Sequence, residues 1–181
     1  ERYRNKTLKK FLLLKETKTF ASPIVPPPEQ NNIFINEYKK SNPKLNLNLL
    51  FIGSLMTVYD FETISKALNI LSIKKIPYKL YIAGKGEHEK KIKKIFKENK
   101  NIIFLGWIDR ETAIQKASIC HIAFAPYKNI INYKLNLVNK FIDYMSLSLP
   151  VLTPLEGHVQ SLINKYEIGW KYKPQDHIAL A

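Results

Sequence analysis

The sequence predicts an α/β fold in which a parallel β-sheet carries helices on both faces. Short apolar runs without polar alternation, such as LNLLFIGSL and YKLYIAG, are typical of strands that are buried on both faces. From residue 45 onward these runs alternate with amphipathic segments. Strands joined by helices need crossover connections, and such connections give a parallel sheet.

The individual elements follow from this alternation and from capping residues. Asp60 and Asp109 precede amphipathic segments, as expected of helix N-caps. Ile64, Leu68 and Leu71 recur on one helical face of the first segment. We expect strands within 47–55, 78–84, 101–108, 119–127, 149–154 and 168–172, and helices within 60–71, 87–99, 109–117, 138–148 and 157–166.

Composition limits the partners of the chain. The 181 residues carry a formal net charge of +14, which favours anionic partners such as nucleotide phosphates, nucleic acid or an acidic membrane face. The alternative is a general bias toward Lys, Asn and Ile, because the lysines are spread along the chain. The single cysteine, Cys120, excludes an internal disulfide framework and has no Cys or His at metal-ligand spacing, so we expect no metal site. No apolar run approaches the roughly 20 residues that span a bilayer.

The first 44 residues differ in character from the rest. Four prolines lie between Pro23 and Pro28, and they favour a stiff, extended connector over helix or central strand. We interpret residues 1–44 as a hinge and the remnant of a missing N-terminal domain, and residues 45–181 as one domain. An ordinary surface loop is the alternative for the proline segment. On this interpretation the chain is a piece of a larger protein.

Candidate ligand-binding residues lie after the predicted strands, because open parallel sheets bind ligands outside the carboxyl ends of their strands. In NKFIDYM, Lys140 and Asp143 share one helical face. A lysine there can pair with a diphosphate, and a carboxylate can accept hydrogen bonds from ribose hydroxyls. Spacing alone favours the simpler alternative of a solvated ion pair. The segment GSLMTVYD after the first strand is not a G-x-G-x-x-G fingerprint.

VNKFIDYMSLSLPVLTP resembles the donor-binding motif of GT-B glycosyltransferases related to family 4, the group 1 glycosyltransferases. That motif runs Pro-Ser/Asn-Lys-x-x-Glu/Asp-Tyr-Met-Ala-x-Gly-x-Pro-Val. LLFIGSL, YKLYIAGKGE, NIIFLGWI and CHIAFAPY resemble other segments of the C-terminal half of these enzymes, in the same order. The resemblance covers roughly residues 45 to 172, and it implies a Rossmann-like domain that is one half of a GT-B fold.

The resemblance implies a role for several residues. Lys140 would neutralise the phosphates of the donor and stabilise the leaving group. Asp143 would hold the ribose hydroxyls. Trp107 and Ile108 would bracket the nucleobase through backbone groups.

Gly53 and Ser54 would face the diphosphate across the interdomain cleft.

The chain also departs from the family pattern. Ser54 stands where many relatives carry arginine or asparagine, Leu135 where a second glutamate is usual, and Ser148 where glycine is usual. Asp143 is shorter than the commoner glutamate.

The resemblance therefore implies the donor-binding domain of a glycosyltransferase, with no cofactor. The enzyme would move a sugar from an NDP-sugar, with a UDP-sugar favoured, to a glycan or lipid-linked acceptor in bacterial cell-surface polysaccharide synthesis. The fragment alone would be inactive, and the whole enzyme would lie in the cytoplasm, peripheral at the inner membrane face. Two alternatives remain: a GT-B sugar-nucleotide epimerase domain, and a basic nucleic-acid-binding module without catalysis. The second lacks the aromatic-and-glycine motifs of common RNA modules.

Overall fold

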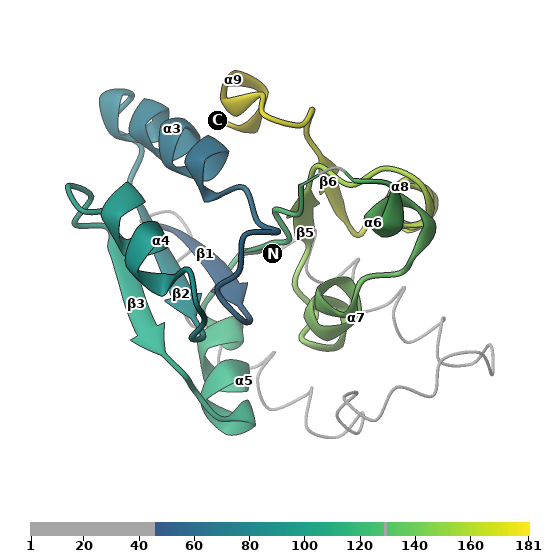
Figure 1. The fold of residues 1–181 in the computed structure, drawn as a ribbon, viewed down its shortest axis with the longest axis horizontal. Helices are drawn as coiled ribbons and strands as arrows, with labels where there is room; N and C mark the ends of the chain where they lie inside the picture. Colours follow the sequence, from purple (N-terminus) through teal and green to yellow (C-terminus); the bar gives the residue numbers. More distant parts are fainter. Residues whose placement is uncertain (1–45, 129) are drawn as a thin grey trace.

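The computed structural model describes residues 46–128 and 130–181, which form a six-stranded parallel sheet with flanking helices (Figure 1). The strands lie in the order β3-β2-β1-β4-β5-β6. Their bounds are β1 Leu47–Ile52, β2 Tyr78–Ala83, β3 Ile102–Gly106, β4 Ile122–Phe124, β5 Val151–Thr153 and β6 Gly169–Lys171. This order is that of a doubly wound, Rossmann-like sheet, so the predicted fold class is confirmed. The order reverses between β1 and β4, and ligands of such sheets bind in the crevice at this point.

Helices cover both faces of the sheet. Their bounds are α3 Phe61–Ile73, α4 Glu89–Ile95, α5 Arg110–Ser118, α6 Ile131–Leu135, α7 Asn139–Ser146, α8 His158–Tyr166 and α9 His177–Leu180. Successive residues of β1 point to opposite faces: Leu49 and Phe51 pack in one core with α3 and α4, whereas Leu50 packs in the other with α5, α7 and α8. The residue after β1 is thus in reach of helices from both layers.

The predicted caps are confirmed. Asp60 Oδ1 accepts a hydrogen bond from the Thr63 amide at 3.0 Å, and Asp109 Oδ1 accepts one from the Thr112 amide at 2.7 Å. Each carboxylate satisfies one of the amides that a helix leaves unpaired in its first turn.

The prediction was wrong in its detail around β4. We expected a strand within 119–127, but β4 contains only three residues, because Ile119 still caps α5 and Pro126 cannot donate to a ladder. The short helices α6 and α9 were not predicted. Neither buries a residue, so neither carries the apolar periodicity that sequence patterns reveal.

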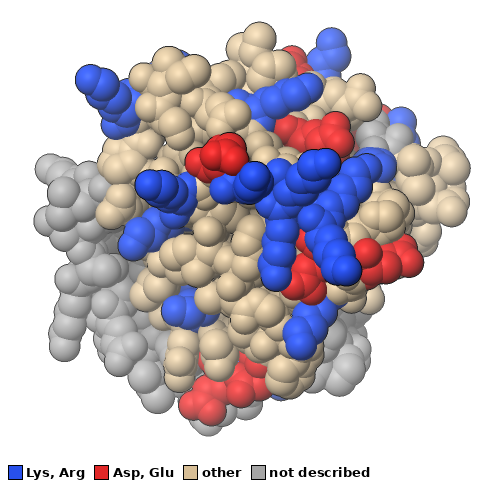
Figure 2. All heavy atoms as spheres, turned by 60° about the vertical axis from the view of Figure 1, so that its left-hand side comes forward, with Lys and Arg blue, Asp and Glu red and all other residues tan. Residues whose placement is uncertain are grey.

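The face of the molecule that carries α3, α4 and β3 bears many positively charged side chains (Figure 2). Figure 2 shows Lys and Arg side chains over the side on which α3, α4 and β3 lie. On α4 the exposed lysines are Lys90, Lys91, Lys93 and Lys94. Within the described ranges, no helix combines the length and the apolar character needed to cross a bilayer. The hinge expected over residues 1–44 falls outside the described part of the chain.

Candidate functional site

Three glycines form a close-packed backbone ledge at the carboxyl ends of β1, β2 and β3. The Gly53 amide donates to the Ala83 carbonyl at 2.9 Å, and the Gly84 amide donates to the Gly106 carbonyl at 2.6 Å. Gly53 and Gly84 have φ values of +148° and +133°, which other residues rarely adopt. A Cβ on Gly84 would lie 2.0 Å from the Gly53 carbonyl oxygen. Both conformation and space therefore favour glycine at Gly53 and Gly84.

Lys140, in the first turn of α7, extends to this ledge. Its Nζ donates a hydrogen bond to the carbonyl of Ile52, and its side chain is only 6% exposed. The ammonium group lies 4.5 Å from the ring centroid of Phe51 and 5.1 Å from that of Tyr59, so two aromatic faces stabilise it. It occupies the space that a Cβ on Gly53 would fill, since the two atoms would be 1.5 Å apart.

Burial changes the titration of this lysine. Loss of solvent lowers the pKa of Lys140 to about 8, and the nearby Asp143 carboxylate offsets part of that shift. At neutral pH the amine is still mostly protonated. It pairs with no described carboxylate within 4.0 Å. The result is a desolvated cation that an anionic ligand would stabilise strongly.

Asp143 lies one turn further along α7. Its Oδ1 is buried and has no hydrogen-bond partner among the described residues. Burial raises the pKa of Asp143, and Lys140 lowers it in part. A buried acceptor without a partner costs free energy, and such atoms often mark sites that bind a ligand.

The same carboxylate lines a cavity of about 190 Å³ between α5 and α7. The other lining residues are Ile52, Arg110, Ala113, Ile114, Tyr144, Ser146 and Leu147. Ligand pockets generally measure about 300–1,000 Å³, so this cavity has room for one ring of a larger ligand.

Tyr144 is a part of the site that the sequence analysis did not identify. Its hydroxyl accepts a hydrogen bond from the Ile52 amide at 2.9 Å, while Lys140 donates to the Ile52 carbonyl. Both polar groups of one residue at the end of β1 are therefore held by α7. The available signal was the i, i+4 spacing of Lys140 and Tyr144, which places them on one helical face.

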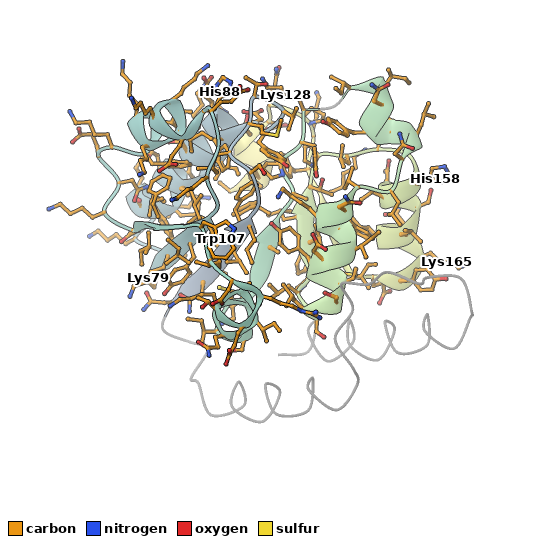
Figure 3. The ribbon with its side chains drawn as sticks, turned by 60° about the horizontal axis from the view of Figure 1, so that its bottom comes forward. Lys79, His88, Trp107, Lys128, His158 and Lys165 are labelled. Atoms are coloured by element: carbon orange, nitrogen blue, oxygen red, sulfur yellow. The ribbon has the colours of Figure 1, made fainter. Side chains whose placement is uncertain are left out.

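The other predicted site residues lie at the same edge of the sheet but are less closely grouped. Ser54 is exposed beside Gly53. Trp107 and Ile108 follow β3, two strands from β1, and Trp107 is 71% exposed (Figure 3). Neither lines the cavity of Asp143, whereas Arg110 from the start of α5 does. The structure thus brings Lys140 to Gly53, and it places Asp143 one helical turn away in a cavity that neither of these two residues lines.

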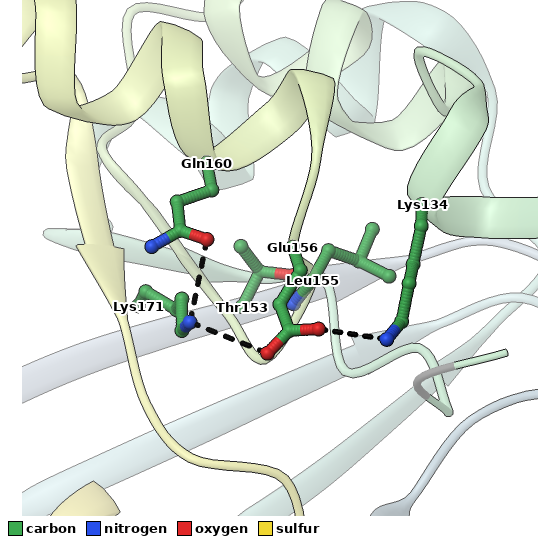
Figure 4. Close-up of polar contacts among 6 residues, drawn as sticks. All are labelled: Lys134, Thr153, Leu155, Glu156, Gln160 and Lys171. Carbon is green, nitrogen blue, oxygen red and sulfur yellow. Dashed lines mark hydrogen bonds and ion pairs between the residues drawn. The ribbon is translucent and has the colours of Figure 1, made fainter. Parts of the chain in front are cut away.

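A second lysine–carboxylate group lies after β5 (Figure 4). Glu156 pairs with Lys134 at 2.8 Å and with Lys171 at 3.6 Å, and Lys171 also donates to Gln160 at 3.3 Å. These side chains are about one third exposed. Gly157, with φ of +73°, lets the chain pass the Lys134 carbonyl. This cluster ties the loop before α8 to α6 and β6.

No group of three or more His, Cys, Asp or Glu side chains within the described residues could hold a metal ion.

The described part of the chain is similar to a known protein family and to several solved structures. The model of a family described as "Glycosyl transferases group 1" matches residues 46–181. A search of curated proteins found no match to the chain. Among solved structures, the apo form of the lipopolysaccharide outer core galactosyltransferase WaaB has a TM-score of 0.62 at 15% identity, covering 89% of this chain and 41% of that one.

Two further structures are similar. The C-terminal domain of a group 1 glycosyl transferase, LpcC from Francisella tularensis, has a TM-score of 0.57 at 17% identity, covering 87% of this chain and 82% of that one. S. aureus TarM, in a complex with fondaparinux, α-GlcNAc-glycerol and UDP, has a TM-score of 0.57 at 13% identity, covering 85% of this chain and 34% of that one. At these identities the likeness shows the fold. The chain spans less than half the length of the WaaB and TarM structures.

Proposed function

This chain belongs to the group 1 glycosyl transferases, and we propose that it binds the nucleotide-sugar donor of such an enzyme. The observation that carries the proposal is the pair on α7: a buried Lys140 ammonium at the end of β1 and a buried, unpaired Asp143 oxygen one turn away. In our proposal the diphosphate lies against Lys140 and the Gly53–Ser54 backbone. The ribose hydroxyls donate to Asp143.

The arrangement supports a nucleoside diphosphate over a simple anion. A phosphate ion would need only Lys140, but the unpaired acceptor of Asp143 needs a donor group such as a hydroxyl. The cavity beside Asp143 has room for a ring, and Trp107 and Ile108 lie further along the same edge to bracket the nucleobase. A UDP-sugar is the favoured donor, and the presence of UDP in the TarM complex supports this choice.

The contribution to catalysis would be electrostatic. When the glycosidic bond to the sugar breaks, negative charge develops on the departing diphosphate. A preorganised cation that is already out of water stabilises that charge with little reorganisation. Lys140 is such a cation, fixed by the Ile52 carbonyl and two aromatic rings.

The rest of the reaction would depend on a second domain. We propose that residues 1–44 connect to it, and that it supplies the glycan or lipid-linked acceptor site. The isolated chain would then bind donor and transfer nothing. Bacterial cell-surface polysaccharide synthesis at the inner face of the cytoplasmic membrane is the proposed setting, and the net charge of +14 would favour an acidic lipid surface.

Calorimetric titration of the chain with UDP and GDP tests the donor proposal. We expect base-selective binding that weakens about 10- to 100-fold in Lys140→Ala, because a charge-assisted hydrogen bond contributes about 1.5–3 kcal/mol. Lys134→Ala is the matched control, since this lysine pairs with Glu156 and should leave UDP binding unchanged. Equal, weak binding of UDP, GDP and pyrophosphate by all three proteins would contradict the proposal.

A further inference from the structure

A groove of about 520 Å³ lies on the other side of the sheet from the Asp143 cavity. Its walls come from the loop between β1 and α3, the first turns of α3, the helix α4, the segment after β4, and the residues around the start of α9. It shares no lining residue with the Asp143 cavity. Its volume falls in the ordinary range for small-molecule sites.

Backbone hydrogen bonds fix these walls relative to one another. The Lys128 amide donates to the Val58 carbonyl at 2.8 Å, and the Asp60 amide donates to the Pro126 carbonyl at 2.8 Å. The His88 amide donates to the Leu55 carbonyl at 3.1 Å. The groove is therefore formed before any ligand arrives, which lowers the entropy cost of binding.

The charges that line the groove are mainly cationic. Lys66 from α3, Lys91 from α4 and Lys128 after β4 converge on it together with His88 and His177. None of the three lysines makes an ion pair with a described residue.

Two other lysines on or just after α4 each lie beside a glutamate. Lys93 pairs with Glu89 at 2.6 Å, and Lys97 lies 3.8 Å from Glu98. Two carboxylates, Asp60 and Glu62, also line the groove, so the three lysines leave it with a small net positive charge.

We propose that this groove binds a phosphate monoester. A dianionic group would satisfy three lysines from three separate elements, and the histidines can donate further hydrogen bonds to its oxygens. Tyr59, Phe61 and Ile92 also line the groove and offer apolar surface to the organic part of the ester. The ester comes either from a small soluble molecule or from a lipid headgroup, and the two sources share this chemistry.

Tyr59 connects the groove with the proposed donor site. It lines the groove, and its ring faces the ammonium group of Lys140 at 5.1 Å. The inference nevertheless stands apart from the donor proposal, because the lysines that carry it take no part in the donor site.

The test is a titration of the 181-residue chain with glycerol 3-phosphate, followed by NMR of the histidine rings. We expect saturable shifts of His88 and His177 and no shift of His121, whose Nδ1 accepts from the Asn48 amide at 2.9 Å and so reports the native fold. In the variant Lys66→Gln/Lys91→Gln/Lys128→Gln, the affinity for glycerol 3-phosphate should fall at least about tenfold, because several charged hydrogen bonds are lost.

Two controls test whether the loss of glycerol 3-phosphate binding is specific to the groove. Lys74→Gln/Lys79→Gln/Lys100→Gln removes the same charge from exposed positions away from the groove and should change the affinity less than about threefold. Lys140→Ala should leave glycerol 3-phosphate binding intact even if it abolishes UDP binding. Equal weakening in both triple variants, or shifts confined to His158, would overturn the proposal.

Sedimentation with vesicles distinguishes the two sources. Vesicles of phosphatidylcholine with phosphatidic acid, compared with phosphatidylcholine alone, present the same monoester on a surface. A lipid headgroup is identified if the native chain sediments with the phosphatidic acid vesicles, the Lys66→Gln/Lys91→Gln/Lys128→Gln variant does not, and glycerol 3-phosphate does not bind. A soluble ester is identified if glycerol 3-phosphate binds and the chain does not sediment with the vesicles. Absence of both overturns the proposal.

Discussion

The site at the end of β1 and the cluster after β5 are both built from lysines and one carboxylate, but they differ in how their charges are satisfied. Glu156 lies between Lys134 and Lys171, partly in solvent, with each charge opposite its counterpart. Lys140 is only 6% exposed, and the Oδ1 atom of Asp143 is buried without a hydrogen-bond partner among the described residues.

The difference separates a structural role from a binding role. A partly exposed ion pair contributes about 0–1 kcal/mol and fastens a loop. A buried cation and a buried carboxylate without full compensation cost stability, and a protein retains such groups where a ligand completes them. The contrast between the two clusters, rather than the presence of lysine and carboxylate, therefore indicates the site.

The largest expected effect is that of Gly53→Ala. The new Cβ would lie 1.5 Å from the Lys140 Nζ, on a backbone with φ of +148°. We expect the free energy of unfolding to fall by about 4 kcal/mol, from backbone strain and displacement of the buried amine. Chemical denaturation measures this loss, and UDP titration should show loss of binding under conditions in which the variant is folded.

Gly106→Ala is the matched control. This glycine lies at the same edge of the sheet, with φ of +68°, but a Cβ there would meet nothing within 4 Å. Only the left-handed conformation is penalised, so we expect a loss of about 1 kcal/mol. Equal losses in the two variants would show that the space at Gly53 is not reserved for Lys140.

The sequence could predict the fold around this site and the helical face that carries it, but not how deeply Lys140 is buried. Buried strand patterns and the caps Asp60 and Asp109 were sufficient for the α/β fold, because they reflect local periodicity and local hydrogen bonds. The i, i+3 spacing of Lys140 and Asp143 placed both on one face of α7. That Lys140 would be nearly buried between Phe51 and Tyr59 depends on packing between segments about 80–90 residues apart, which spacing does not encode.

The contribution of Lys140 to the free energy of unfolding should depend on pH. Unfolded lysine has a pKa of 10.5, whereas burial lowers the pKa of Lys140 in the folded protein to about 8. Between these values the unfolded state binds more protons, so the contribution of this group to stability rises with pH, by about 3 kcal/mol in total. Below pH 8 the cost of burying the charged amine is present in full.

Comparison with Lys140→Met isolates this effect. The difference in unfolding free energy between the native chain and the variant should increase in favour of the native chain from pH 8 to pH 10.5. The buried tyrosines, such as Tyr144 with its raised pKa, titrate alike in both proteins and cancel. A difference that stays constant over this interval would mean that Lys140 is solvated.

The smallest expected effect distinguishes the two carboxylates. Glu156→Gln should lower the free energy of unfolding by less than about 1 kcal/mol, because its ion pairs are partly exposed, and 1 M salt should remove most of the difference. Asp143→Asn removes a charge whose Oδ1 is buried, but it also removes the carboxylate that partly offsets the burial of Lys140, so we expect stability to change by less than about 1 kcal/mol. UDP affinity should show the opposite order, with about a tenfold loss in Asp143→Asn and none in Glu156→Gln. If Glu156→Gln weakened UDP binding and Asp143→Asn did not, the structural and the binding cluster would have to exchange roles.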